Sequence, residues 1–141
     1  MANPQQRRFT VRVLKQAEVD PAFKDLRHSD LQMLLAFAER FDALGWLPPM
    51  DEEKRRILAI HDVMMYPIRD DLSVYEFRSK GGRGERDPWL SIFFHVASDR
   101  TLRICGIELM DKVSRHRTTI VESMVARAIV LDKWLKRNKE R

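Results

Sequence analysis

The chain has 141 residues, 44% of them hydrophobic, and a formal net charge of +5, which together predict one domain, residues 1–141, with a substantial buried core. Its single cysteine, Cys105, excludes a disulfide within the chain and favours a reducing, cytoplasmic location. No apolar stretch approaches the ~18 residues that span a bilayer, and residues 1–8 lack an apolar signal core, so we expect no association with a membrane.

The positive charge is confined to the second half of the chain. Residues 78–141 contain 15 Lys and Arg against 8 Asp and Glu, whereas residues 1–77 contain 11 against 13. This asymmetry predicts an anionic partner that approaches one end of the fold, and RNA is the first candidate. Solvated helix and loop faces would also account for the charge alone.

The first half of the chain predicts a strand followed by two helices. Phe9, Val11 and Val13 alternate with polar residues, which is typical of a strand with one buried face. Asp20 followed by Pro21 predicts a short helix to about residue 27. The second helix is expected to start with a capping box and to end at a glycine; its cap, stripe and end residues are Ser29, Gln32, Leu31, Leu34, Leu35, Ala38, Phe41, Leu44 and Gly45.

Residues 46–71 carry weaker signals. Pro48 and Pro49 interrupt the chain, and Asp51 is expected to cap a short charged helix that ends near His61. The adjacent His61 and Asp62 would suit a metal ion, but no further His or Asp cluster supports them. We therefore expect no metal site and no small-molecule cofactor.

Three strands are predicted in the second half. Apolar residues alternate over residues 72–79, 89–96 and 101–109, and two hairpin-like segments, the glycine-rich basic 81–86 and 97–100, separate these runs. Alternation divides the middle strand into two faces. We assign the more apolar face to the core; it consists of Leu90, Ile92, Phe94 and Val96. The other face, which consists of Trp89, Ser91, Phe93 and His95, leaves Trp89 and Phe93 free to stack on RNA bases unless both lie under the final helix.

A long amphipathic helix is expected to close the chain. Thr119 and Glu122 form a second capping box, and the apolar stripe consists of Ile120, Val121, Met124, Val125, Ala128, Leu131 and Leu135. All these elements together predict an α+β fold with a small antiparallel sheet of about four strands. The N-terminal helix pair should cover one face of that sheet, and the C-terminal helix completes the fold.

Four short motifs follow one another in the second half. They are Val74-Tyr75-Glu76-Phe77-Arg78, Trp89-Leu90-Ser91-Ile92-Phe93-Phe94, Arg103-Ile104-Cys105-Gly106-Ile107 and Met110-Asp111-Lys112. In this order, after a strand and a helix pair and before a terminal helix, they resemble the RelE/HigB-type branch of the RelE/ParE toxin superfamily, including its phage-derived HigB-like members. The family commonly has an arginine early in the aromatic-rich strand, where this chain has Leu90 and Ser91.

The resemblance implies an RNA-binding toxin of a type II toxin–antitoxin pair. Such a toxin inhibits translation by cleaving mRNA on the ribosome, without a metal, and a cognate antitoxin protein is its partner. Cleavage requires the RNA 2′-hydroxyl to lose a proton, the phosphorane to be stabilised and the 5′-oxygen to gain a proton.

Basic side chains can meet all three requirements. We expect the catalytic residues to be His116, Arg117, Lys112 and His95, and the RNA- or phosphate-binding residues to be Arg78, Arg86, Arg115 and Trp89. Arg78 also has a competing structural role, because Glu76 shares its strand face and an ion pair across the sheet would use it.

Two alternatives remain open. The first is the gyrase-directed branch of the same superfamily, a protein-binding inhibitor with no hydrolytic site. The second is a noncatalytic, phage-derived module of the same fold that binds nucleic acid or protein. The basic cluster over residues 112–117 favours RNA.

Overall fold

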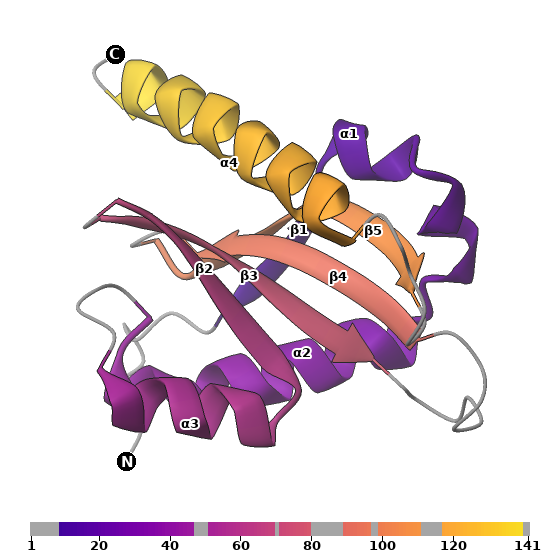
Figure 1. Cartoon of the computed structure of the whole chain (residues 1–141). Helices are drawn as coiled ribbons and strands as arrows, with labels where there is room; N and C mark the ends of the chain where they lie inside the picture. The colour runs from indigo at the N-terminus through magenta and orange to yellow at the C-terminus, as the bar shows by residue number, and fades with distance from the viewer. Residues whose placement is uncertain are drawn as a thin grey trace.

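The computed structural model describes residues 9–46, 51–69, 71–79, 89–96, 99–110 and 117–139. Within these ranges the chain forms an α+β fold in which a five-stranded sheet lies between two layers of helices (Figure 1). In chain order the strands and helices, with 3-10 helices labelled η, are β1 Thr10–Val13, α1 Lys15–Glu18, η1 Pro21–Asp25, α2 His28–Phe41, η2 Asp42–Leu44, α3 Glu52–Ile60, β2 Val63–Arg69, β3 Leu72–Ser79, β4 Trp89–Val96, β5 Thr101–Met110 and α4 Arg117–Lys139.

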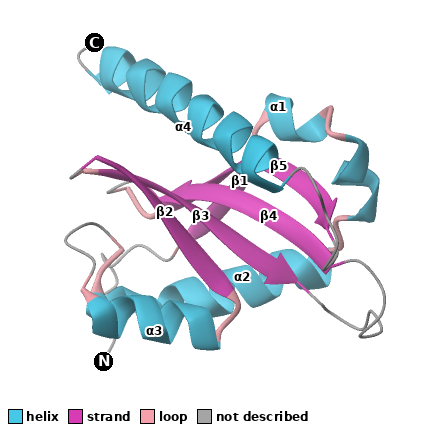
Figure 2. Ribbon diagram, viewed as in Figure 1, coloured by secondary structure: helices cyan, strands magenta, loops and turns pink. Residues whose placement is uncertain are grey.

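The five strands form a mixed sheet in the order β1-β5-β4-β3-β2 (Figure 2). β1 runs parallel to β5, with Thr10 opposite Thr101, and the other neighbours are antiparallel. β3 and β4 have the predicted bounds, and β5 is one residue longer than predicted. The α+β class is confirmed, but the expectation of about four antiparallel strands is corrected to five strands with one parallel pair. The predicted N-terminal helix pair is corrected too, because residues 21–25 form only the short η1 beside β5, and α3 lies beside α2 instead (Figure 1).

The sequence does not predict β2 because Pro67 interrupts its alternation. Proline is tolerated here because β2 is an edge strand, where one row of backbone N–H groups needs no strand partner. The register with β3 shifts between Pro67 and Arg69. The parallel pairing of β1 escapes prediction for another reason, namely that it depends on where a long connection returns the chain.

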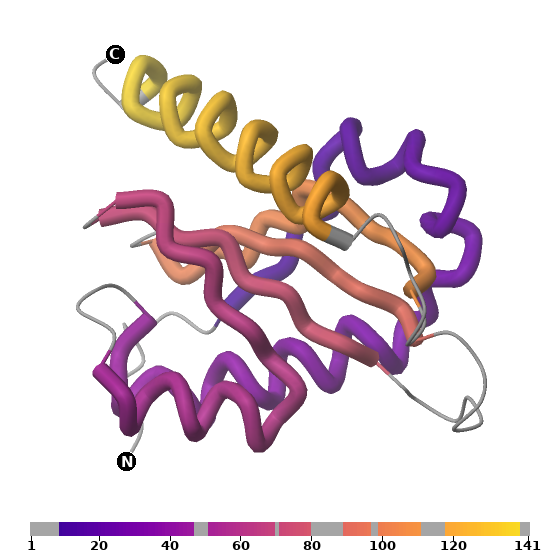
Figure 3. The backbone as a smooth tube through the Cα atoms, in the orientation of Figure 1, coloured from indigo at the N-terminus to yellow at the C-terminus, as the bar shows by residue number. Residues whose placement is uncertain are grey.

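Helices cover both faces of the sheet. α2 and α3 lie on one face, and α4 crosses the other (Figures 1 and 3). The larger core joins α2 to the predicted core face of β4, including Phe94, and confirms that assignment. The smaller core packs Met124 and Ala128 of α4 on Phe93 and Cys105. Phe93 is fully buried there, so its expected availability for base stacking is wrong.

Only one of the four predicted helix caps is found in the structure. Asp51 caps α3 as predicted, since its carboxylate accepts a 2.8 Å hydrogen bond from the N–H of Lys54. Asp20 does not cap η1, because its carboxylate accepts a 2.9 Å hydrogen bond from the N–H of Ile107 in β5. The two predicted capping boxes are wrong because their helices start earlier than expected, at His28 before Ser29 and at Arg117 before Thr119.

Candidate functional site

Arg78 and Trp89 lie together at one end of the sheet. Arg78 is the penultimate residue of β3, and Trp89 is the first residue of β4. The guanidinium carbon of Arg78 lies 5.4 Å from the centroid of the Trp89 ring, which is a cation–π contact. The structure therefore brings together two of the predicted RNA-binding residues.

Strand register places Arg78 in a row with two further polar residues. Arg78 pairs with Ser91 of β4, and Ser91 pairs with Glu108 of β5. Paired residues project to the same side of a sheet, and neighbouring strands lie ~4.8 Å apart, so the row spans about 10 Å. Val74, four residues before Arg78, packs under α4, so the row lies on the sheet face that α4 crosses.

Glu76 is a fully buried carboxylate beside this row. Its Oε1 accepts a 2.6 Å hydrogen bond from the hydroxyl of Tyr66 in β2, and its Oε2 accepts one of 2.6 Å from the hydroxyl of Ser91. Ser91 in turn accepts a 3.0 Å hydrogen bond from the indole N–H of Trp89. The hydroxyl of Ser91 thus accepts from the indole N–H and donates to Glu76. Each carboxylate oxygen of Glu76 accepts one hydrogen bond.

Three contacts hold the guanidinium of Arg78. Its Nε lies 3.6 Å from Oε2 of Glu76, one Nη lies 2.6 Å from the sulfur of Met64, and Trp89 lies against it. The competing role expected for Arg78 thus takes the form of an ion pair on its own strand. The side chain is still 27% exposed, so it remains accessible to a ligand. We call this group the Arg78 cluster; it consists of Tyr66, Glu76, Arg78, Trp89, Ser91 and Glu108.

Glu108 is a titratable group of the cluster that the sequence analysis does not single out. Its side chain is half-buried, and burial raises the pKa of its carboxyl, as does the negative charge of nearby Asp20. The positive charge of Arg127 opposes this rise, and a carboxyl with a raised pKa is a candidate for proton transfer. The signal in the sequence is a lone acid between Ile107 and Leu109 in an apolar strand.

His95 lies far from Arg78 and Trp89. It follows Trp89 by six positions on the same strand, a distance of about 20 Å. The residue is only 6% exposed, burial lowers its pKa, and its Nδ1 has no hydrogen-bond partner among the described residues. The structure therefore does not bring this predicted catalytic residue to Arg78 or Trp89, the two predicted binding residues that it describes.

The remaining predicted site residues are not located by the structure, with one partial exception. Arg117 is the first residue of α4. The others lie outside the described residues and are Arg86, Lys112, Arg115 and His116. The ends of the neighbouring strands β3, β4 and β5 lie side by side, since Ser79 pairs with Leu90 and Trp89 pairs with Met110.

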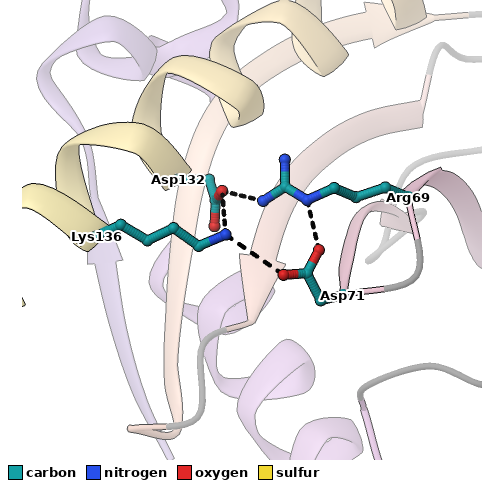
Figure 4. A network of polar contacts seen from close by, with 4 residues as sticks. All are labelled: Arg69, Asp71, Asp132 and Lys136. Carbon is teal, nitrogen blue, oxygen red and sulfur yellow. Dashed lines mark hydrogen bonds and ion pairs between the residues drawn. The ribbon is translucent and has the colours of Figure 1, made fainter.

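Ion pairs fix α4 over the opposite end of the sheet (Figure 4). Arg69, the last residue of β2, contacts both Asp71 and Asp132, and Lys136 lies 3.4 Å from Asp71 and 3.3 Å from Asp132. Hydrogen bonding from Arg69 lowers the pKa of Asp71. From the sequence, only the ion pair between Asp132 and Lys136 could be predicted, because the two residues are four positions apart on one helix. Their other partners lie on β2, which the sequence does not predict, and on the turn that follows it.

Neither a reactive thiol nor a metal centre is found in the described part of the chain. Cys105 is fully buried, and burial raises the pKa of its thiol to about 12, so it is an inert core residue. The described residues contain no group of three or more His, Cys, Asp or Glu side chains that could hold a metal ion.

The Arg78 cluster combines a fixed cation, an aromatic surface and a carboxyl with a raised pKa. No protein-family model, curated protein or solved structure matches the chain. The guanidinium can donate to phosphate oxygens and the indole can stack on a base, whereas Glu76, with both oxygens accepting hydrogen bonds, acts as the counter-ion of Arg78.

Proposed function

We propose that the chain is a metal-independent endoribonuclease of the RelE/HigB type, the toxin of a type II toxin–antitoxin pair, and that it binds mRNA at the Arg78 cluster. The observation that carries this proposal is the anchored guanidinium of Arg78, 5.4 Å from the Trp89 ring. The cluster also contains the end of β3 and the start of β4, where the basic half of the sequence begins.

Binding of single-stranded RNA needs a positive group for the phosphate and a flat group for the base. Arg78 supplies the first, with a planar fork that can form two parallel hydrogen bonds to one phosphate. Trp89 supplies the second, because its ring is only partly buried. Both side chains are already held in place, so little conformational entropy is lost when RNA binds.

Cleavage needs a charged donor for the phosphorane and groups that move protons. We assign charge stabilisation to Arg78 and proton transfer to Glu108, which lies about 10 Å away across the strand row. His116, Arg117 and Lys112 keep their expected catalytic roles as predictions from sequence.

The proposal includes two macromolecular partners and a site of action. We expect the ribosome to present the mRNA, and a cognate antitoxin protein to neutralise the toxin in the cytoplasm. No helix within the described ranges has the length and apolar character needed to cross a membrane.

A noncatalytic RNA-binding module is the second candidate. The buried positions of Phe93 and His95 favour it, because neither side chain is exposed on the face on which RNA was expected to bind. This alternative retains the Arg78–Trp89 contact as a binding site but has no chemical step.

Induced expression of the full chain, followed by mapping of mRNA 5′ ends, tests the proposal. We expect growth arrest and new ends in phase with codons, because the ribosome positions the message. Normal growth with intact mRNA would favour the noncatalytic module, and arrest with DNA damage but uncut mRNA would favour a gyrase inhibitor.

A Glu108→Gln variant separates binding from chemistry. The amide cannot exchange a proton, so we expect RNA affinity close to wild type and cleavage slower by about 100-fold or more. Single-turnover cleavage of mRNA in the presence of ribosomes would measure this effect. Wild-type cleavage by Glu108→Gln would remove Glu108 from the mechanism.

A further inference from the structure

The outer side of α4 carries an apolar pair that no described part of the chain covers. Val130 is 58% exposed and Trp134 is 55% exposed. They are four residues apart, so they lie next to each other on one side of the helix. Met124 and Ala128, by contrast, are buried on the sheet side of the same helix. Tryptophan is enriched at the energetic centres of protein interfaces, and Val130 extends the exposed apolar area beside it.

The charges around this pair all have one sign. Lys133 and Arg137 are exposed on α4 beside Val130 and Trp134, and they define with them the outer face of α4. Asp132 is the only acidic residue between positions 123 and 138, and its side chain is turned inward to Arg69 (Figure 4). The side-chain charges of the outer face are therefore exclusively positive.

We propose that the outer face of α4 is the docking surface for an acidic amphipathic segment of a protein partner. Apolar side chains of that segment cover Val130 and Trp134, and its carboxylates pair with Lys133 and Arg137. A second copy of this chain does not fit, because two such faces would place like charges together. RNA would stack on Trp134 but would leave the aliphatic Val130 uncovered, so an apolar protein segment fits the pair better.

This surface is separate from the Arg78 cluster, because it lies on the side of α4 that points away from the sheet. The inference therefore does not depend on the proposed nuclease activity. A protein bound to the outer face would leave Arg78 and Trp89 uncovered unless it also extended around the helix.

Binding of a synthetic helical peptide tests the docking surface. The probe is a fluorescein-labelled peptide of leucine, alanine and glutamate, with leucines along one side and glutamates on both flanks. Its anisotropy is measured with the full chain and with two variants, Trp134→Ala and the double substitution Lys133→Glu/Arg137→Glu. We expect both variants to bind at least about ten-fold more weakly, with unchanged thermal unfolding, because all three positions are exposed.

Matched substitutions on α3 serve as controls. Ile60→Ala removes another exposed apolar residue, and Arg55→Glu/Arg56→Glu reverses two other exposed charges. Both control proteins should bind the peptide as wild type does, and a peptide with lysine in place of glutamate should not bind. Equal binding by wild type and Trp134→Ala would overturn the proposal. So would a Trp134-dependent affinity for oligouridylate or phosphatidylglycerol vesicles that exceeds the affinity for the acidic peptide.

Discussion

Phe94 lies at the centre of the larger core, between two aromatic neighbours. It is fully buried, its ring stacks on Tyr75 with centroids 5.4 Å apart, and Trp46 meets it edge-on at 5.9 Å. We expect Phe94→Ala to lower the free energy of unfolding by about 3–5 kcal/mol, because it removes buried ring contacts and leaves a cavity. Urea unfolding measures this, with Ile60→Ala, at a position 71% exposed, as a control that should change little. A small loss for Phe94→Ala would contradict the core described above.

His95 should make stability depend on pH. Burial lowers its pKa below the ordinary 6.5, although the negative charge of Asp132 opposes this effect. The positive charges of Arg103 and Arg69 add to the lowering, and Asp99 opposes it. The unfolded chain therefore takes up a proton at a higher pH than the folded chain does. The contribution of His95 to the free energy of unfolding should be fully present above about pH 6.5. It should decrease as the pH falls from there toward the folded pKa.

A His95→Gln variant tests this pH dependence, because glutamine does not titrate. Its unfolding free energy should decrease less than that of wild type when the pH is lowered through this window. Parallel pH profiles for the two proteins would show that His95 is not the residue responsible.

At the scale of single residues, the sequence predicts that Arg78 and Trp89 stand at the ends of neighbouring strands, but it does not predict the contacts that they make. Arg78 and Trp89 are recognisable because an arginine and a tryptophan stand at the ends of two alternating strands joined by a basic loop. The hydrogen bond from Tyr66 to Glu76 is not predictable, since β2 itself is not. The burial of His95 depends on α4, whose position on the sheet no local pattern specifies.

At the scale of elements, α4 is held to the sheet by an ion pair and by a methionine side chain that packs on a glycine of β5. Arg127 donates 2.9 Å and 3.0 Å hydrogen bonds to the carboxylate of Asp20 and one of 2.9 Å to the carbonyl of Cys105. A Cβ atom at Gly106 would lie 1.9 Å from the sulfur of Met124, so glycine allows the helix to pack this closely. The helix is therefore fixed by partners that are distant in the sequence.

Substitution of Asp20 should loosen this attachment. Its side chain is only 7% exposed, and it serves both Arg127 and the N–H of Ile107. We expect Asp20→Ala to lower the unfolding free energy by about 3 kcal/mol, because two partly buried donors lose their acceptor. Chemical denaturation gives the value, and Lys133→Ala on the exposed side of α4 is the control. Comparable small effects of both substitutions would mean that Asp20 does not fix α4.

The element scale also shows why the sequence predicts helices better than their first residues. The apolar periodicities of α2 and α4 extend over many residues and are correctly recognised. Their first residues depend on single side chains that have alternatives. Asp20 looks like a cap but bonds to β5. The N-cap of α2 is Arg27 rather than Ser29, and Asp30 rather than Gln32 accepts a 2.8 Å hydrogen bond from its N–H.

At the scale of the whole molecule, the sheet separates two helical layers. Helices α2 and α3 lie on one face with the larger core, and α4 lies on the other (Figure 1). The strand register places the Arg78 cluster on the face that α4 crosses. The sequence predicts the three strands β3, β4 and β5 as neighbours, because short segments join them. It does not predict the fifth strand, the parallel pair or the helix across the second face, because these depend on contacts between distant residues.

The most direct test of the central claim, that the Arg78 cluster cleaves mRNA, compares wild type, Arg78→Lys and Arg55→Lys by mapping mRNA 5′ ends in cells. Arg78→Lys keeps a positive charge beside Glu76, but lysine has neither the planar face that lies against Trp89 nor the paired donors for phosphate. The account predicts codon-phased cuts for wild type and Arg55→Lys, and their loss for Arg78→Lys at an unchanged unfolding temperature. Undiminished cutting by Arg78→Lys, or intact mRNA with the wild-type chain, would contradict it.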